Sequence, residues 1–499
     1  MKKKLLFWID SSLYNFINAK FIGEKFDCDL YSIYDITDNP KNFFKKQKFV
    51  AFKNSWFFHD QIDQTHKKPD MKYLESFESR FNINLWLQAF YERNFYDFNK
   101  FHKFSSDEVL SILEQECKFY ENILDEINPD YLIIPQPFFH HDNLLIKMCK
   151  KLGITCLLIR PTRLDPNRCM IDNNDAYTPI NFIRSTKNEE FSFTSIQNKL
   201  NSIKNFENTK KSESSNSSNK LGAVINYTFS SNSNLQTHYT YYGRTKINVL
   251  FTTFIMSIKG KIRKNFLDKY SKYSIDSEKN FIYFPLHQDE EESTLVGAPF
   301  FTNQIELIKN IIKSLPVGYK LFVKESPSNA ARDWRRISDY KKLLDLPNLV
   351  LLHPTVDPNE ILKKCSLVIS IVGTTALESA YYMKPSIIFG DTPFSNLNSV
   401  TKINQLSELP ALIRTMLTKK IDYSDVADFH DYVEKNSFQL NLSQIWKSIS
   451  DHFQFGGAYV DVKITDEQVN EYISKNSNEF TILANAYIQK IKSEEDSHA

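Results

Sequence analysis

A short polar segment late in the chain carries residue types suited to binding a phosphate. Gly373, Thr374 and Thr375 follow an apolar run, and Glu378 comes three residues later. A glycine lets a ligand approach the backbone closely, and free N–H groups at the start of a helix favour an anion. The pattern predicts a phosphate held at these three residues, with Glu378 accepting hydrogen bonds from a ribose. It equally suits a tight turn with an acidic residue near the start of a helix.

Two further segments place polar side chains directly after apolar runs. His287 and an acidic stretch containing Glu291 follow one run, and Lys324 follows another. An imidazole or an ammonium group beside a departing phosphate stabilises the charge that develops there. We therefore predict His287 and Glu291 as catalytic residues and Lys324 as a donor-binding residue. A solvated acidic loop and a lysine that covers a sheet end are the alternatives.

The first part of the chain offers a second set of polar residues at the ends of apolar runs. Asp10 directly follows the first run and is predicted to act as a base or nucleophile. Arg160 ends another run and suits an anionic sugar. His140, His141 and Asp142 precede a predicted helix. We predict these three and Arg160 as acceptor-binding or sugar-binding residues, although the two histidines also suit a loop or a packing role.

The elements that must position these residues alternate along the chain. Short apolar runs read as buried strands, and stretches with helical spacing separate them. The predicted strands cover residues 4–9, 30–34, 131–134, 154–159, 281–286, 320–323, 349–352, 367–372 and 386–389. The predicted helices cover residues 106–127, 143–152, 303–314, 330–344, 358–364 and 374–383. This alternation predicts an α/β fold with two doubly wound parallel sheets, in which ligands bind at the carboxyl ends of the strands.

The 499 residues are enough for two large domains or three ordinary ones. Residues 208–220 contain no apolar side chain, so they are predicted to be a linker. We expect an N-terminal α/β domain over residues 1–207 and a linker with connecting helices over 208–274. A C-terminal Rossmann-like domain over 275–420 and a helical extension over 421–499 follow.

Composition excludes several classes of protein. Lysine and arginine total 62 against 60 aspartates and glutamates, which argues against a general nucleic-acid binder. The six cysteines form no CxxC pair, so they indicate neither a zinc site nor a disulfide framework, and a cytoplasmic location fits best.

No apolar run of the sequence is long enough to cross a membrane. A basic stretch over residues 259–272 fits either a helix that touches anionic lipid or a solvated connecting helix. Any membrane contact is therefore expected to be peripheral, at the inner face of the plasma membrane.

The polar segments resemble, in their order, the motifs of the bacterial capsule polysaccharide biosynthesis family, which includes retaining Kdo transferases. The resemblance is strong over residues 281–391, and residues 137–142 also look like the family. The matching segments are Leu286–Thr294, Val323–Pro327, Gly373–Glu378, Met383–Pro385 and Phe389-Gly390. The chain departs from the family pattern at Glu290, which replaces a proline, at Ser326, which replaces a histidine, and at Met383, which replaces a glycine.

The resemblance implies a GT-B fold, with two Rossmann-like domains facing a cleft and a helical tail. It also implies transfer of a sugar, Kdo or another acidic sugar, from a nucleotide-sugar donor such as a CMP-linked one. The acceptor would be a glycan or lipid-linked glycan held by the N-terminal domain, and the C-terminal domain would hold the donor. No further cofactor is implied.

A metal is not predicted. Asp27-Cys28-Asp29 has the DxD pattern of metal-nucleotide sites, but it precedes a strand instead of following one. The glycine-rich, P-loop, zinc-protease and nucleophile-elbow motifs are absent from the sequence, which removes the usual NAD, NTPase, zincin and hydrolase interpretations. A teichoic-acid-type polyol-phosphate transferase and a catalytically silent scaffold of polysaccharide assembly remain alternatives to the glycosyltransferase.

Overall fold

The computed structural model describes residues 2–63, 68–96, 98–173, 177–183, 227, 238–275, 280–332, 334–421 and 424–498. The predicted linker at 208–220 lies outside these residues. The chain divides into two compact units. Unit 1 comprises Met1–Asp175, Lys199–Lys246 and Val433–Ala499, and unit 2 comprises Ala176–Asn198 and Ile247–Tyr432.

Unit 1 is built on a seven-stranded sheet in the order β13-β6-β5-β4-β1-β2-β3. The five strands from β5 to β3 in this order are parallel, and β6 and β13 continue the sheet in antiparallel pairs. The strands are β1 (Lys3–Asp10), β2 (Cys28–Asp35), β3 (Asn54–Phe57), β4 (Tyr131–Pro135), β5 (Thr155–Pro161), β6 (Arg168–Asp172) and β13 (Phe438–Gln439).

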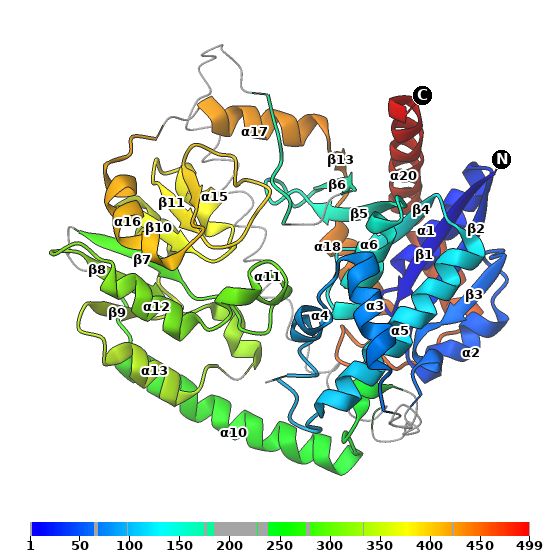
Figure 1. Ribbon diagram of the computed structural model, residues 1–499, viewed down its shortest axis with the longest axis horizontal. Helices are drawn as coiled ribbons and strands as arrows, with labels where there is room; N and C mark the ends of the chain where they lie inside the picture. The colour runs from blue at the N-terminus through cyan, green and yellow to red at the C-terminus, as the bar shows by residue number, and fades with distance from the viewer. Residues whose placement is uncertain are drawn as a thin grey trace. The chain divides into compact units, whose positions relative to one another are not determined.

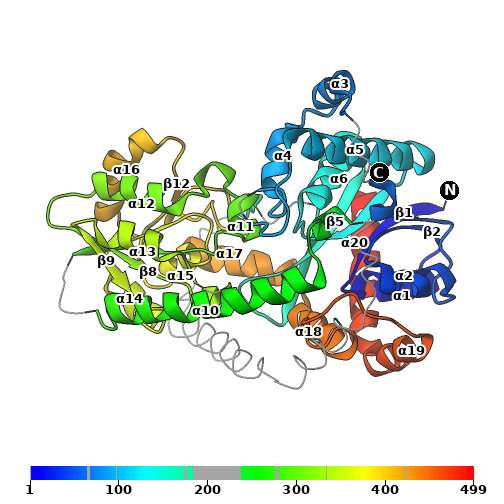
Figure 2. The ribbon, with the colours of Figure 1, turned by 90° about the horizontal axis from the view of Figure 1, so that it is seen from below.

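Side chains of β1 alternate between the two faces of this sheet, as the period of two in a strand requires. Leu5, Phe7 and Ile9 enter one apolar core, and Leu6 and Trp8 enter the other. Figure 2 shows helices on both sides of the sheet. They are α1 (Tyr14–Lys25), α2 (Asp38–Lys46), η1 (Phe58–Gln61), α3 (Met71–Phe81), α4 (Leu85–Tyr91), α5 (Ser106–Ile127), α6 (His140–Lys151), η2 (Tyr239–Tyr241), α18 (Leu442–Phe453), α19 (Asp466–Lys475) and α20 (Ser477–His498).

The C-terminal residues are part of unit 1, which corrects the prediction of a separate helical extension over 421–499. Phe480, Leu483 and Tyr487 recur at helical spacing in α20, and all three are fully buried in the core that contains Phe7. Strand β13 also pairs with β6 at the sheet edge. Burial of this apolar face gives the tail its place in the core, because an exposed face of this kind is unfavourable in water.

Unit 2 is built on a six-stranded, fully parallel sheet in the order β12-β11-β10-β7-β8-β9. The strands are β7 (Phe281–Pro285), β8 (Lys320–Lys324), β9 (Leu349–Leu352), β10 (Leu367–Ser370), β11 (Ser386–Ile388) and β12 (Val400–Lys402). The helices are α10 (Lys246–Tyr270), α11 (Glu292–Leu295), η3 (Pro299–Phe301), α12 (Gln304–Lys313), η4 (Pro327–Arg332), α13 (Ile337–Leu344), α14 (Pro358–Lys364), α15 (Thr375–Ala380), η5 (Leu406–Glu408), α16 (Leu409–Thr418) and α17 (Ser424–Lys435), which ends in unit 1 (Figure 1).

The predicted fold class, two α/β domains each on a mainly parallel sheet, is confirmed. The predicted helix over 330–344 is wrong. Its first part is the 3-10 turn η4, and α13 begins only at Ile337. Trp334 has a left-handed backbone with φ of 60°, which no helix accommodates, and Arg335 turns into the interior.

Among the described residues, no helix combines the length and apolar character needed to cross a membrane.

Candidate functional site

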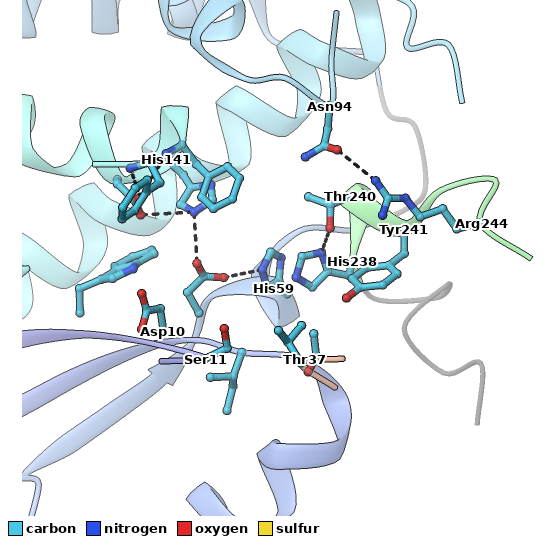
Figure 3. Close-up of a pocket in the computed structure, with 17 residues that line it drawn as sticks. Asp10, Ser11, Thr37, His59, Asn94, His141, His238, Thr240, Tyr241 and Arg244 are labelled. Carbon is cyan, nitrogen blue, oxygen red and sulfur yellow. Dashed lines mark hydrogen bonds and ion pairs between the residues drawn. The ribbon is translucent and has the colours of Figure 1, made fainter. Parts of the chain in front are cut away.

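A pocket of about 260 Å³ opens at the carboxyl ends of β1 and β2 in unit 1 (Figure 3). Parallel strands end at the same edge of a sheet, so residues that follow them gather there. The pocket is lined by Trp8, Asp10, Ser11, Asp35, Ile36, Thr37, His59, Asn94, Phe138, Phe139, His141, Asp142, His238, Thr240, Tyr241, Arg244 and Val460. Three of the predicted residues, Asp10, His141 and Asp142, are thus brought together.

Asp10 is the last residue of β1 and lies in the pocket wall. Its carboxylate accepts hydrogen bonds from the backbone N–H of Ser12, at 2.9 Å, and from the Ser12 hydroxyl. Burial raises the pKa of Asp10 despite these hydrogen bonds. A carboxylate with a raised pKa is a stronger base, which suits the predicted role of Asp10 in accepting a proton.

Asp35, the last residue of β2, joins two histidines. Its Oδ1 lies 2.8 Å from Nε2 of His59, and its Oδ2 lies 3.3 Å from Nε2 of His141 (Figure 3). Burial opposes ionisation, but the hydrogen bonds from His141 and His59 outweigh it and hold the pKa of Asp35 well below its usual value. Asp35 is therefore an anion that orients both rings.

The two histidines bonded to Asp35 differ in charge. Burial lowers the pKa of His141, but Asp142 and Asp35 together raise it above the ordinary value. For His59 burial prevails over Asp35, and its pKa is lowered. One side of the carboxylate thus meets a ring that favours the imidazolium form, and the other meets a neutral ring.

His238 brings a third imidazole to the pocket. Its ring stacks on that of His59 with centroids 3.2 Å apart, and its Nδ1 is hydrogen-bonded to the Thr240 hydroxyl (Figure 3). Burial and the neighbouring His59 lower the pKa of His238 well below the usual value. One nitrogen or oxygen from each of Asp35, His59 and His238 lies within 4.8 Å of the others.

Asp142 lies in the first turn of α6, not in a loop before a helix. The helix begins at His140, three residues earlier than predicted, because the Asp142 carboxylate accepts hydrogen bonds from the N–H groups of Phe138 and Phe139 at 3.0 and 3.2 Å. Burial raises the pKa of Asp142 to about 6, although the neighbouring His141 opposes this.

The remaining two residues of the predicted acceptor set do not line the pocket. His140 is fully buried, with Nδ1 3.0 Å from Glu92 and Nε2 2.8 Å from Glu116. Burial lowers its pKa, but the two carboxylates outweigh burial and raise it to about 10. Arg160 is bonded to Asp172 of β6 at 3.1 Å.

The DxD segment lies at the start of β2, at the opposite end of the strand from Asp35. Asp27 precedes the strand and forms an ion pair with Lys2 at 2.6 Å. Asp29 is the second residue of the strand.

In unit 2, the first and third motifs touch. His287 Nε2 lies 3.1 Å from the hydroxyl of Ser370, which also accepts a hydrogen bond from the N–H of Gly373 at 3.1 Å. A Cβ atom on residue 373 would lie 2.8 Å from the His287 ring, so only glycine fits. Burial, reinforced by Arg335, lowers the pKa of His287 to about 4, which leaves the ring neutral at pH 7.

Arg335 joins the first motif to the second. Its guanidinium is bonded to the backbone carbonyl of His287, to Asp289, and at 3.1 Å to the fully buried Glu325. Lys324 precedes Glu325 and is itself buried as the last residue of β8. Arg335 therefore links the segment after β7 to the segment after β8. Sequence analysis did not identify this residue.

The other donor residues predicted in unit 2 are more exposed. Helix α15 covers only Thr375–Ala380, shorter than the predicted 374–383. Glu378 lies in its first turn and accepts a hydrogen bond from the Thr374 hydroxyl at 3.3 Å. Glu291, which was predicted as a catalytic residue, is exposed and is the N-cap residue that precedes the short helix α11.

Several pocket and motif residues were missed by sequence analysis. The contact of Asp35 with His59 spans 24 positions, and those of Arg335 with Asp289 and His287 span 46 and 48. His59 and His238 are 179 positions apart, so these four residues belong to no local pattern. Only Asp35 carried a usable signal, since it follows a predicted strand as Asp10 does.

Residues 194–415 match the family model described as "Capsule polysaccharide biosynthesis protein". The predicted resemblance to this family is confirmed. The match includes every motif of unit 2. The pocket residues of unit 1 that precede position 194 lie outside it. A comparison with curated proteins finds no match to this chain.

Solved structures similar to this chain share little sequence with it. Thermosulfurimonas dismutans KpsC, a beta Kdo 2,7 transferase, is 10% identical with a TM-score of 0.31, over 74% of this chain and 97% of that one. The UDP-GlcNAc 2-epimerase from Methanocaldococcus jannaschii is 12% identical with a TM-score of 0.25, over 87% and 99%. The N-terminal domain of Candida albicans trehalose-6-phosphate phosphatase is 13% identical with a TM-score of 0.31, over 90% and 96%.

Proposed function

We propose that this protein is a glycosyltransferase of capsular or surface polysaccharide biosynthesis. It transfers a sugar, Kdo or another acidic sugar, from a nucleotide donor held by unit 2 to a glycan acceptor held by unit 1. The observation that carries the proposal is the contact of His287 with Ser370 and, through it, with Gly373. This contact joins two family motifs within the stretch that matches the capsule family model.

The chemistry divides between the units. In unit 2, the neutral His287 ring and Lys324 stabilise the negative charge that grows on the donor phosphate as the glycosidic bond breaks. Glu378 binds the ribose, and no metal is needed at the phosphate. In unit 1, Asp10 takes the proton from the acceptor hydroxyl, because its raised pKa makes it a better base than an ordinary aspartate.

Nucleotide binding tests the donor half of this proposal. We expect CMP, CDP or UDP to raise the melting temperature of the full chain, since a ligand at 100 times its dissociation constant adds about 2.7 kcal/mol to stability. Failure of all three nucleotides to shift the melting temperature would favour the silent scaffold.

The variant Glu378→Ala locates the site. We expect it to weaken binding of the active nucleotide by about 1 to 3 kcal/mol, through the loss of charge-assisted hydrogen bonds. The exposed Glu360 on α14 gives a matched control, and Glu360→Ala should bind the nucleotide as the wild type does. Equal affinity in the Glu378 variant and wild type, measured by calorimetry, would remove Glu378 from the donor site.

We also propose that the protein works in the cytoplasm and touches the inner face of the plasma membrane through α10. One face of this helix exposes apolar side chains that recur every three or four residues, and its second half is rich in lysine. The exposed apolar residues are Ile247, Leu250, Phe251, Phe254, Ile258 and Ile262. Each lysine or arginine near an anionic surface adds about 1 kcal/mol, and the apolar stripe adds burial in the headgroup region.

Flotation with anionic liposomes at low salt tests this contact. The chain should float with the vesicles, and Phe251→Ser with Phe254→Ser should leave it at the bottom of the gradient. Phe300→Ser removes another exposed phenylalanine of unit 2 and should float normally. Wild-type protein that stays at the bottom would rule out the contact.

A further inference from the structure

The pocket of unit 1 contains an arginine that the proposed transfer chemistry does not use. Arg244 follows η2 and lines the pocket together with Asn94 and Tyr241 (Figure 3). Its guanidinium lies over the rings of Tyr241 and Phe101, at 5.7 and 5.1 Å from the ring centroids. Its Nη2 group donates one long hydrogen bond, of 3.4 Å, to Oδ1 of Asn94. The aromatic rings and the neutral amide orient this cation but do not neutralise its charge.

The lack of an acidic partner distinguishes Arg244 from two other arginines of unit 1. Arg80 forms an ion pair with Glu121, and Arg160 forms one with Asp172. Among the described residues, no carboxylate forms an ion pair with Arg244, and its Nε atom is buried without a hydrogen-bond partner. A buried donor of a charged group costs free energy unless a ligand binds it. Arg244 thus offers the donors that sequence analysis expected of Arg160.

Two more side chains of the pocket wall have a buried polar atom with no hydrogen-bond partner among the described residues. They are Thr37, through its hydroxyl, and His59, through Nδ1. The two residues are only 7% and 5% exposed. Buried polar groups in native proteins are nearly always hydrogen-bonded, so these atoms and Nε of Arg244 indicate a ligand with several polar groups.

Acidic and cationic side chains lie in different parts of this pocket. Figure 3 shows Asp10 on one side of the stacked rings of His59 and His238, and Arg244 on the other. The carboxylates of Asp10 and Asp35 repel an anionic group, whereas Arg244 attracts it. A charged ligand therefore binds with its anionic group at Arg244 and with uncharged hydroxyl groups toward Asp10.

We propose that Arg244 selects an acceptor whose sugar in the pocket carries a carboxylate or phosphate group. This inference rests on the proposed function and adds that the acceptor is anionic. A guanidinium presents its N–H groups in a planar fork, which fits two oxygen atoms of either anion. Thr37 and His59 hold hydroxyl groups of the same sugar.

Ligand-observed NMR titrations of the full chain test this selection. Methyl glucuronide is the carboxylate probe, glucose 6-phosphate is the phosphate probe, and methyl glucoside is the neutral control. We expect the wild type to bind at least one anionic probe about tenfold more tightly than the neutral one, because hydrogen bonds to a charged group contribute about 1.5 to 3 kcal/mol.

Variants locate the effect in the pocket. Arg244→Gln should remove the preference for the anionic probe, and Arg244→Lys should retain part of it, because lysine keeps the charge but not the planar fork. Arg80→Gln gives a matched control and should bind as the wild type does, because Arg80 does not line the pocket.

Three results would overturn the selection. They are equal affinity of the wild type for charged and neutral probes, no binding of either anionic probe, and an unchanged preference in Arg244→Gln. The comparison of probes in the wild type decides the question even if a variant does not fold, and it also tells a carboxylate from a phosphate. Nucleotide binding to Arg244→Gln should persist, since the proposed donor residues lie in unit 2. Failure of the acceptor selection and failure of the proposed transferase are therefore separate results.

Discussion

The two units place their polar residues at the same kind of sheet edge but use them differently. In unit 1, imidazoles and carboxylates meet directly around Asp35 and enclose a pocket. In unit 2, Arg335 bonds both the Glu325 carboxylate and the backbone carbonyl of His287. Gly373 has no side chain, so its backbone is open to a ligand. The end of a strand in a parallel sheet thus marks where a site can form, but the groups around it decide whether the site favours proton transfer or anion binding.

Removal of the Arg335 side chain should give the largest effect, a loss of stability. It tests whether this one cation holds the motifs of unit 2 together. Arg335→Ala leaves the buried Glu325 carboxylate without its ion-pair partner, so we expect a loss of about 3 to 5 kcal/mol in the unfolding free energy of unit 2. Denaturant unfolding followed by fluorescence measures it. The neighbouring Arg336 is exposed, and Arg336→Ala should change little. Equal stability of the two variants would show that Arg335 does not hold the motifs together.

Replacement of His287 should affect turnover more than folding. His287→Ala removes a neutral donor beside Ser370 and Gly373, and we expect turnover to fall by about 100-fold with little change in the Michaelis constant. The control is His353→Ala, which removes a buried histidine bonded to Asp268 in the same unit and should lower the melting temperature while sparing turnover. A His287 variant that loses melting temperature but keeps its turnover per folded molecule would make His287 a packing residue.

A third effect concerns pH and separates His140 from the pocket histidines. The folded pKa of His140 is about 10, above the value near 6.5 expected in the unfolded chain. Its contribution to stability is therefore complete below pH 6.5 and is lost as the pH rises toward 10, at up to about 1.4 kcal/mol per pH unit.

Urea unfolding at pH 7 and pH 9 measures this loss. His140→Gln should be less stable at pH 7, and its stability should fall less between the two pH values, because glutamine does not titrate. A variant with the same pH slope as the wild type would mean that Glu92 and Glu116 do not keep His140 protonated.

Much of the fold follows from local features of the sequence. Ser105 caps α5 with a capping box at the start of the helix predicted over 106–127, and Asp357 with Pro358 begins α14 where the helix over 358–364 was predicted. The predicted strands agree with the observed ones to within about two residues at each end, because buried strands need continuous apolar runs. These runs also place Asp10, His287 and Lys324 at strand ends, which is why they could be selected from sequence alone.

Other features depend on contacts between distant segments, and only the tertiary structure decides them. His59 and His238 are 179 positions apart, so no local pattern predicts that their rings stack. The break before α13 was missed because the apolar spacing of 330–344 is helical, while the buried contacts of Arg335 with Glu325 and Asp289 favour another path. His140 and His141 are neighbours, yet one turns into the core and the other into the pocket, since adjacent residues on a helix point about 100° apart. Local periodicity and capping predicted nine of the thirteen strands that the structure describes, and they identified polar residues at the ends of those strands. Only the long-range packing of the sheets and helices decided which of those residues meet.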